Sequence, residues 1–368
     1  MRASGLVRVI GMDPGTRSLD ICGLEDGKVF LDETIPTKVM ASSPESIASK
    51  IEENMPIDLV AAPSGYGLPF IAISELDGHN LSQVVLARGE DLKVGVPGLT
   101  VLLKIFKERG FKGYTIPGVI HLPTVPYYRK ANRIDMGTAD KLCCAALGVY
   151  DQAERLNIGY KETSFIIVEL GYAFTAALAV RDGLIIDGLG GSTGPLGFQS
   201  LGSMDGELAY LLGGFSKEVL FTGGAAYMAG DPGMDPEDFV ASSSTNDRCR
   251  WALEALLEGV EKAVAALQVS AGRVREILLS GRLSRIPRLE LLLKERLRKY
   301  ALTRRVGLIA SVSKEAAQGA ALIADGLAGG RFEALIEAMR LREAEGTVLD
   351  HLYIKGREEI RISPIGED

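Results

Sequence analysis

A short polar run directly after the first apolar stretch of the chain is the strongest candidate for chemistry. It reads DPGTRS, and the residues that could contact a ligand are Asp13, Gly15, Thr16, Arg17 and Ser18. A carboxylate at the end of a strand can hold a hydrated Mg²⁺ ion, which prefers few protein ligands and several waters. A glycine lets the backbone approach a phosphate closely, while backbone N–H groups, hydroxyls and an arginine donate to its oxygens. The run is therefore either an ordinary hairpin turn or a phosphate-binding loop.

A glycine that follows another apolar strand is the second candidate. In ILLSGRLSRIP (277–287), Gly281 would let a flat adenine or ribose lie against bare backbone. Arg282, the next residue, could stack on the base or pair with a phosphate. The alternative is a plain strand-to-helix turn followed by a solvated arginine.

Several other kinds of active site are excluded by residue spacing. His79, His121 and His351 lie far apart, with no carboxylate or cysteine at the spacing of a metal site or a catalytic triad. The four cysteines form no C-x-x-C pair and indicate reduced, buried thiols of an intracellular protein. The phosphate-binding pattern G-x-x-x-x-G-K-[ST] does not occur in the chain.

The composition indicates a soluble, ordered chain with more than one domain. With 368 residues, 46% of them apolar and 24% charged, the chain is long for one globular unit, so we expect two domains. The formal net charge of −7 argues against bulk nucleic-acid binding, which needs a basic face. No stretch is apolar and long enough for a signal peptide or a membrane span, so we expect no membrane association and a cytoplasmic location.

The candidate phosphate loop lies between two strands. Short β-type runs at 6–12, 19–24 and 28–35 flank DPGT and the hairpin signal EDGK, then a helix is expected at 44–54 and a buried strand within 57–69. A Rossmann site needs its glycine-rich loop between a strand and a helix. The order of elements therefore excludes a dinucleotide-binding start.

The same order of elements returns in the second part of the chain. SFIIVEL (164–170), AALAV (176–180) and LIIDGL (184–189) read as strands, with GYAFT and RDG as their turns. Two copies of strand–turn–strand–turn–strand indicate two structurally related halves. The glycine-rich GGSTGPLGFQSLG (190–202) is expected to line the cleft between them. Further helices are expected at 99–109, from 138 onward, and at 205–213, 216–229, 246–271, 284–300, 314–327 and 331–344, with a strand at 275–281 and a short C-terminal hairpin within 349–362.

Five segments together resemble the motifs of the actin-like ATPase superfamily, which includes sugar kinases, acetate and butyrate kinases, heat-shock ATPases and actin. GMDPGTRSLDI resembles the first phosphate loop, and VELGYAFTAALAVRDG resembles the second. IDMGTADKLCCAALGVY and EAAQGAALIADGL are similar to the two connecting helices, and ILLSGRLSRIP is similar to the adenosine segment. More narrowly, DGLGGSTGPLGFQSLGSMDGELAYLL resembles carboxylate kinases, and the whole chain resembles an uncharacterised group of predicted butyrate kinases.

The resemblance implies an α/β fold of two duplicated actin-like (ribonuclease H-like) domains. Each would be a mixed five-stranded sheet flanked by helices, with a nucleotide cleft between the two. The first domain would span residues 1–160 and the second 161–368. Small residues at Gly137 and at 319–321 would let the connecting helices cross closely and act as a hinge. A homodimer is the implied assembly, because carboxylate kinases of this type often dimerise through the second half.

The resemblance also implies roles for individual residues. Asp13 would hold Mg²⁺ and take part in catalysis. Contacts to ATP are implied for Asp13, Gly15, Thr16, Arg17 and Ser18 in the first loop, for Gly171 and Thr175 in the second, and for Gly281 and Arg282 in the adenosine segment. Glu169 stands where the family usually has Asp, and it would either contact the metal or be purely structural. Ser280 replaces the first glycine of the usual Gly-Gly pair.

An acid near the start of the first connecting helix faces the acceptor in these kinases. Asp135 matches that place, with Asp140 as the alternative, and Arg133 and Lys141 would either hold an anionic substrate or be surface charges. A sugar hydroxyl needs its proton accepted, whereas a carboxylate is already ionised and needs only charge neutralisation and alignment. We therefore expect an ATP- and Mg²⁺-dependent kinase for a small molecule, first of all a short-chain carboxylate. The alternatives are an ATP-binding switch protein with slow or no hydrolysis and a sugar kinase.

Overall fold

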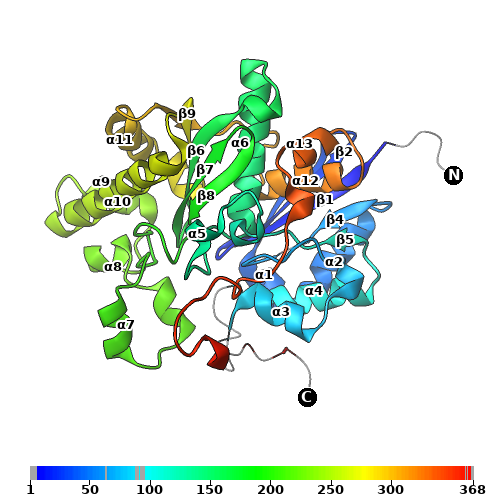
Figure 1. Ribbon diagram of the computed structural model, residues 1–368, viewed down its shortest axis with the longest axis horizontal. Helices are drawn as coiled ribbons and strands as arrows, with labels where there is room; N and C mark the ends of the chain where they lie inside the picture. Colours follow the sequence, from blue (N-terminus) through cyan, green and yellow to red (C-terminus); the bar gives the residue numbers. More distant parts are fainter. Residues whose placement is uncertain are drawn as a thin grey trace.

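Two five-stranded sheets form the framework of the computed structural model (Figure 1), which describes residues 6–62, 64–87, 91, 96–360, 362 and 364–365. The first sheet consists of β1 (Arg8–Pro14), β2 (Ser18–Glu25), β3 (Lys28–Pro36), β4 (Leu59–Ala61) and β5 (Gly113–Tyr114), in the order β3-β2-β1-β4-β5. β1, β2 and β3 are antiparallel, whereas β4 runs parallel to β1 and β5 parallel to β4.

The second sheet repeats this arrangement strand for strand. Its members are β6 (Ser164–Leu170), β7 (Thr175–Arg181), β8 (Leu184–Leu189), β9 (Glu276–Ser280) and β10 (Leu302–Arg305), in the order β10-β9-β6-β7-β8. β6, β7 and β8 are antiparallel, whereas β9 and β10 continue the sheet in parallel. The central strands β1 and β6 are therefore equivalent, and the expected duplication of a mixed five-stranded sheet is confirmed.

Local turn chemistry sets the hairpins beside the central strands. Asp26 and Gly27 join β2 to β3 with φ angles of 49° and 73°, and Asp182 and Gly183 join β7 to β8 with φ angles of 54° and 75°. Asp-Gly pairs tolerate this left-handed backbone, which matches the twist of a two-residue hairpin. The sequence signal EDGK therefore has a direct structural counterpart in each half.

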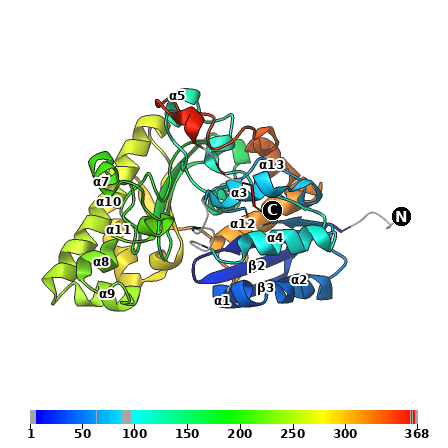
Figure 2. The ribbon, with the colours of Figure 1, turned by 90° about the horizontal axis from the view of Figure 1, so that it is seen from below.

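Helices cover both faces of each sheet. In the first part of the chain they are α1 (Thr37–Ser42), α2 (Pro44–Glu53), α3 (Gly78–Val85), α4 (Leu99–Glu108), α5 (Tyr127–Lys130) and α6 (Ala139–Leu156). They continue with α7 (Gly206–Leu212), α8 (Ala225–Ala229), α9 (Pro236–Ser242), α10 (Asp247–Ala271), α11 (Pro287–Leu297), α12 (Glu315–Leu327) and α13 (Glu333–Ala338). Figure 2 shows α10 and α11 on the outer side of the second half and α2 and α4 on that of the first. An apolar core with side chains from both central strands, α6 and α12 lies between the sheets.

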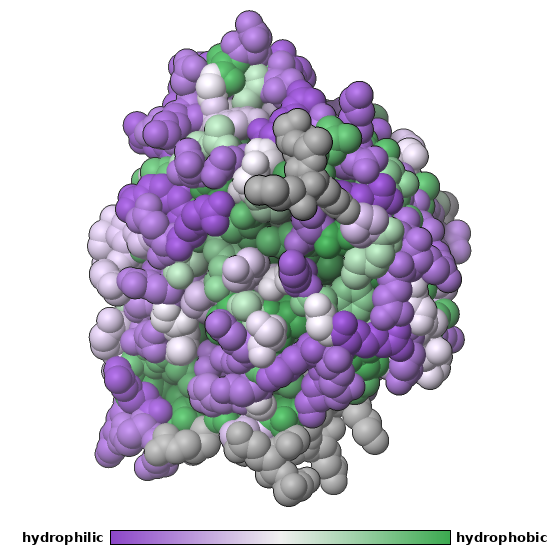
Figure 3. All heavy atoms as spheres, turned by 90° about the vertical axis from the view of Figure 1, so that its right-hand side faces the viewer, coloured by the Kyte–Doolittle hydropathy of each residue, from purple (hydrophilic) through white to green (hydrophobic). Residues whose placement is uncertain are grey.

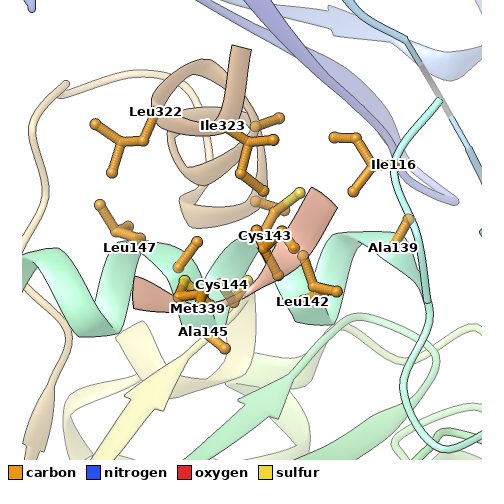
Figure 4. Packing of buried hydrophobic residues seen from close by; sticks show 14 of the residues in the cluster. Ile116, Ala139, Leu142, Cys143, Cys144, Ala145, Leu147, Leu322, Ile323 and Met339 are labelled. Carbon is orange, nitrogen blue, oxygen red and sulfur yellow. The ribbon is translucent and has the colours of Figure 1, made fainter. Parts of the chain in front are cut away.

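The two long helices of this core cross at backbone contact distance. An ideal Cβ on Gly319 of α12 would lie 1.9 Å from the carbonyl oxygen of Cys143 in α6, so only glycine permits the approach. α12 also lies directly on β1, where a Cβ on Gly11 would lie 2.1 Å from the backbone nitrogen of Ala321. Figure 4 shows the apolar side chains of α6 and α12 packed against each other.

Most predicted elements are confirmed to within a few residues, but some local expectations are wrong. The predicted helix 216–229 is interrupted, because Gly223 adopts a φ of 79° between a 3₁₀ turn at Lys217–Phe221 and α8. The predicted helix 331–344 is limited to α13 and a 3₁₀ turn at Leu341–Glu343. Gly137 does not lie at the helix crossing but against Leu178 of β7.

The predicted C-terminal hairpin is absent from the described residues of segment 349–362, of which Arg361 lies outside the description. Its backbone bonds to a distant asparagine instead of a second strand. Asn132 donates its backbone N–H to the carbonyl of His351 (2.8 Å), and its Oδ1 accepts from the N–H of Tyr353 (2.7 Å). Alternating apolar and polar residues therefore did not specify a strand here.

Figure 3 shows hydrophilic residues over most of the face at the right-hand side of Figure 1, with apolar residues gathered in its middle. Within the part of the chain that the structure describes, no helix combines the length and the apolar character that a membrane crossing requires.

The substitution Gly319→Ala tests the helix crossing. Because the added methyl group would meet the backbone of α6, we expect the free energy of unfolding to fall by about 2–3 kcal/mol, the usual cost of overpacking. Gly206→Ala is the matched control, since a Cβ on this first residue of α7 has nothing within 4 Å and alanine favours helices. Urea denaturation measures both variants, and equal stability of the two would contradict a crossing at contact distance.

Candidate active site

A cavity of about 250 Å³ lies between the two halves, where the central strands β1 and β6 end. The sequence-predicted residues that line it are Asp13, Gly15, Thr16, Arg17, Ser18, Asp135, Asp140, Lys141, Glu169, Gly171 and Arg282. Three further predicted residues, Thr175, Gly281 and Arg133, are described by the structure but do not form part of its wall. The fold therefore brings most of the predicted residues together from segments far apart in the sequence.

The two loops at the cavity are the same hairpin built twice. In the first loop the N–H of Gly15 donates to the carbonyl of Ser18 (2.8 Å), and in the second the N–H of Gly171 donates to the carbonyl of Phe174 (3.0 Å). In each half an acidic residue precedes the glycine at the same spacing. The duplication of the sheets thus extends to the loops that were predicted to bind phosphate.

The two loops differ in the side chains that they present. Residues 16–18 read Thr-Arg-Ser in the first loop, and the equivalent residues 172–174 read Tyr-Ala-Phe in the second. Thr175 is the first residue of β7, and its buried Oγ1 has no hydrogen-bond partner within the described residues. The second loop can therefore offer a phosphate its backbone and a tyrosine hydroxyl, but not the threonine hydroxyl that we predicted.

Asp13 presents a carboxylate without a hydrogen-bond partner to the cavity, as far as the described residues show. The residue is 7% exposed. Burial, followed by the negative charge of Asp140, raises the pKa of Asp13 to about 8, while Lys314 and Lys141 act in the opposite direction. A cation beside Asp13 would stabilise its ionised form, which is the chemistry expected of a metal ligand.

Lys314 is a residue of the cavity wall that the motifs did not reveal. Its Nζ lies 2.6 Å from Ser18 Oγ and 2.9 Å from Asp20 Oδ2. Asp20 is fully buried and also accepts a hydrogen bond from Ser18 Oγ (2.9 Å). These contacts fix the hydroxyl of the first loop and place a positive charge beside Asp13. The only signal in the sequence was a lysine directly before the second connecting helix.

Lys141 joins the two halves at the cavity. Its Nζ lies 2.5 Å from Asp140 Oδ2 and 3.3 Å from Glu169 Oε2. Burial alone would lower the pKa of Lys141, but Asp140 and Glu169 raise it well above its ordinary value. Burial alone would likewise raise the pKa of Asp140, but Lys141 and the Thr138 hydroxyl hold it below its ordinary value. Burial raises the pKa of Glu169, whose Oε2 has no hydrogen-bond partner among the described residues.

A cation–π contact bridges the two loops. The guanidinium carbon of Arg17 lies 3.9 Å from the ring centre of Tyr172, and the guanidinium donates to the tyrosine hydroxyl. The guanidinium carbon of Arg282 lies 5.7 Å from the same ring centre and the side chain pairs with Asp235 at 3.6 Å. Two arginines are thus held at the loop side of the cavity. There they could pair with a phosphate or stack on a base.

Gly281 makes room for Glu169. Its φ is 84°, in the left-handed region that favours glycine. A Cβ added to this residue would lie 2.5 Å from Glu169 Oε1 and 2.5 Å from the carbonyl oxygen of Leu170. The preceding residue, Ser280, is fully buried, and its Oγ has no hydrogen-bond partner in the described part of the chain. The structure therefore ties Gly281 to the packing of the second loop, and the predicted nucleotide contact of this glycine is not supported by its position.

Asp135 lies at the cavity but is already engaged. Its carboxylate accepts hydrogen bonds from the N–H of Gly137 (3.0 Å) and from the N–H and hydroxyl of Ser192 (2.9 Å and 3.0 Å). These bonds hold the start of the glycine-rich segment 190–202 beside the cavity, and Gly191 lines it. Arg133 is exposed and contributes nothing to the wall, so the structure does not bring it to the predicted acid.

An apolar surface completes the wall of the cavity. Its side chains are those of Tyr66, Val84, Val85, Val96, Leu99, Ile116 and Phe221. Lys217 at its edge donates to the carbonyls of Val85 and Leu86, the latter at 3.1 Å, and its Nζ lies 4.6 Å from the ring centre of Tyr66. Burial lowers the pKa of Lys217 to about 8. No motif pointed to these residues, because their contacts join separate segments of the chain.

The acidic residues of the cavity could contribute one carboxylate to a magnesium ion whose other ligands are waters and phosphate oxygens. Among the described residues, no group of three or more His, Cys, Asp and Glu side chains is arranged to enclose a metal. Mg²⁺ usually binds through one or two carboxylates and keeps waters and phosphate oxygens as further ligands. The carboxylate of Asp13 fits this pattern, whereas Glu169 would first have to separate from Lys141.

Comparisons with known proteins agree with this architecture. A family model described as "Protein of unknown function (DUF1464)" matches residues 11–354. No curated protein matches the sequence. Among solved structures, acetate kinase from Entamoeba histolytica is similar with a TM-score of 0.62 at 13% identity, over 79% of this chain and 86% of that chain.

Two further carboxylate kinases are similar over nearly their whole length. Acetate kinase from Porphyromonas gingivalis has a TM-score of 0.60 at 13% identity, over 85% of this chain and 98% of that chain. A propionate kinase from Francisella tularensis subsp. tularensis SCHU S4 has a TM-score of 0.60 at 12% identity, over 85% and 99%. At these identities the likeness shows the fold alone, and the expected fold of two duplicated actin-like domains is confirmed.

The buried carboxylate of Asp13 makes stability depend on pH. In the unfolded chain it titrates near 3.8 and in the folded chain near 8. Between these values the folded protein binds more protons than the unfolded chain, so the free energy of unfolding falls as pH rises. Asp13→Asn removes the ionisable group and therefore this loss of stability. In the absence of nucleotide and metal, we expect the substitution to raise the melting temperature by several degrees at pH 9 and by much less at pH 5. The same shift at both pH values would contradict the assignment.

Proposed function

The chain belongs to the family described as protein of unknown function (DUF1464), and we propose that it is an ATP- and Mg²⁺-dependent phosphotransferase for a small carboxylate. In this reaction an acceptor carboxylate oxygen attacks the γ-phosphorus of ATP. The bond from that phosphorus to the bridging oxygen of ADP breaks, and ADP and an acyl phosphate are released. The fold shared with acetate and propionate kinases supports a kinase, and the acceptor is argued from the cavity.

The observation that carries this proposal is that both candidate bases are already committed. The carboxylate of Asp135 accepts three hydrogen bonds from Gly137 and Ser192. Asp140 is paired with Lys141 at 2.5 Å, and its pKa lies below the ordinary value because Lys141 outweighs the effect of burial. Neither acid is well prepared to take a proton from a sugar hydroxyl. A carboxylate acceptor needs no base, so it fits this wall better than a hydroxyl does.

The first loop would hold the phosphates. Its backbone N–H groups and the hydroxyl of Thr16 can donate to phosphate oxygens. The hydroxyl of Ser18 supports the loop instead, because it donates to Asp20 and accepts from Lys314 at 2.6 Å. Asp13 would hold Mg²⁺, which neutralises phosphate charge when it is bound. Arg17 is within reach once it leaves Tyr172. Phosphoryl transfer depends mainly on such positioning and charge neutralisation.

The apolar surface supports an acceptor with a short apolar chain. Side chains of Val84, Val85 and Leu99 would contact that chain, because they line the same cavity as Asp13. Water would be displaced from this surface, at roughly 25 cal/mol for each Å² of apolar area buried. Lys217 at the edge carries the positive charge that could offset an acidic group.

A nucleotide-dependent switch protein is the second candidate. It is favoured by the second loop, where residues 172–174 provide two apolar side chains and no threonine or serine hydroxyl for a phosphate. Such a protein would bind ATP but consume it slowly. The two candidates differ in one property, since only a kinase accelerates ATP consumption when the correct acceptor is added.

A panel of acceptors distinguishes these functions. Purified protein is incubated with Mg-ATP and short-chain carboxylates, hydroxy acids or sugars; ADP is followed, and hydroxylamine traps acyl phosphates. We expect a carboxylate to raise ADP release and to yield a hydroxamate. Asp13→Asn should lower this rate by about two orders of magnitude, because it removes the metal ligand. Asp26→Asn is the matched control in an exposed turn and should keep the rate, since Asn tolerates its φ of 49°.

The outcomes that contradict the proposal differ in meaning. Acceleration by sugars without a hydroxamate would exclude the carboxylate acceptor and retain a kinase. Binding of ATP, seen as a raised melting temperature, with no acceleration by any acceptor would favour the switch protein. Equal rates in the two asparagine variants would remove Asp13 from the proposed site.

A further inference from the structure

Lys141 lies between two carboxylates that come from different halves of the molecule. Asp140 belongs to the first turn of α6, and Glu169 lies at the end of β6. The ammonium is 2.5 Å from Asp140 Oδ2 and 3.3 Å from Glu169 Oε2. All three side chains line the cavity, so the ammonium occupies a two-carboxylate cation position in the wall.

An ion pair that only holds the two halves together would leave two observations unexplained. A buried ion pair normally offsets its lost hydration with further hydrogen bonds. Oε2 of Glu169 has none among the described residues, although it is buried. Asp13 also acts on Lys141, so three carboxylates share the field of this ammonium. Asp140 and Glu169 therefore share a single ammonium, and the group borders a cavity rather than a closed core.

We propose that Lys141 is a built-in cation of the active site, which fills the position between Asp140 and Glu169 that a divalent ion would otherwise take. A metal that enters with the nucleotide is then left to Asp13. Lys141 has three N–H donors, and those not used by Asp140 can reach a phosphate oxygen. This last contact rests on the proposed function, whereas the exclusion of a divalent ion from the nucleotide-free protein does not.

The proposal changes the role of Glu169. As a predicted metal contact it would bind the ion itself. In this assignment it is a positioning residue, which holds the ammonium of Lys141 from the second half while Asp140 holds it from the first. The position of the cation therefore depends on both halves of the molecule.

Manganese binding to the nucleotide-free protein tests the proposal. Mn²⁺ takes carboxylate and water oxygens as Mg²⁺ does, and electron paramagnetic resonance measures the free ion. Lys141→Met keeps most of the side-chain length and removes the charge. We expect this variant to bind Mn²⁺ about tenfold or more tightly than the wild type, because the carboxylates lose their resident cation and attract another.

Three matched variants show whether charge at this position is the cause. Lys141→Arg keeps the cation and should bind Mn²⁺ as weakly as the wild type. Lys217→Met removes a cavity lysine for which no pairing with these acids is found in the described residues, and it should not gain affinity. Lys141→Met combined with Glu169→Gln should lose the gain. Melting curves check folding, and Lys141→Gln replaces the methionine variant if that variant does not fold.

The proposal is overturned if the folded neutral variant binds Mn²⁺ no more tightly than the wild type. It is also overturned if Lys141→Arg or Lys217→Met gains as much affinity as Lys141→Met. None of these results depends on an acceptor. If Lys141→Met gains the metal site but no acceptor accelerates ATP consumption by the wild type, the built-in cation stands and the proposed kinase function fails.

Discussion

The contact between Gly319 of α12 and the backbone of Cys143 in α6 is the constraint on which the rest of the structure depends. Both helices begin at the cavity. The crossing fixes their axes, and it therefore also fixes the positions of the side chains near the start of each helix. α6 delivers Lys141, and Lys314 stands directly before α12. Because each helix also packs on a central strand, both lysines are held in register with the loop at the end of that strand.

The duplication that builds the fold has not produced two equal phosphate loops. The first loop keeps an open carboxylate at Asp13, hydroxyls and a supporting lysine, whereas the second has apolar side chains and a glutamate that is paired with Lys141. The first half therefore carries most of the groups suited to phosphate. The second half contributes Tyr172, which holds Arg17, and the carboxylate that positions the shared ammonium. Charge is distributed across the cleft, so the site is complete only when the halves are together.

Features encoded by short-range patterns could be predicted, and contacts between distant segments could not. The strand 164–170 and the hairpin turns follow from local periodicity and Asp-Gly chemistry. Lys314 was missed because its partners lie on β2, and no local pattern encodes that contact. Thr175 was assigned to the loop, but β7 already begins there, and the residue is not part of the cavity wall. The hairpin within 349–362 failed because Asn132 takes its backbone hydrogen bonds.

The central claim is that the cavity between the halves holds a magnesium nucleotide on the first loop. A crystal structure with Mg²⁺ and a non-hydrolysable ATP analogue measures this directly. The account predicts phosphate oxygens within hydrogen-bond distance of the N–H groups of Thr16 and Arg17 and the metal on Asp13, bound directly or through water. A triphosphate outside the cavity, or a metal on Glu169 with Lys141 displaced, would contradict it.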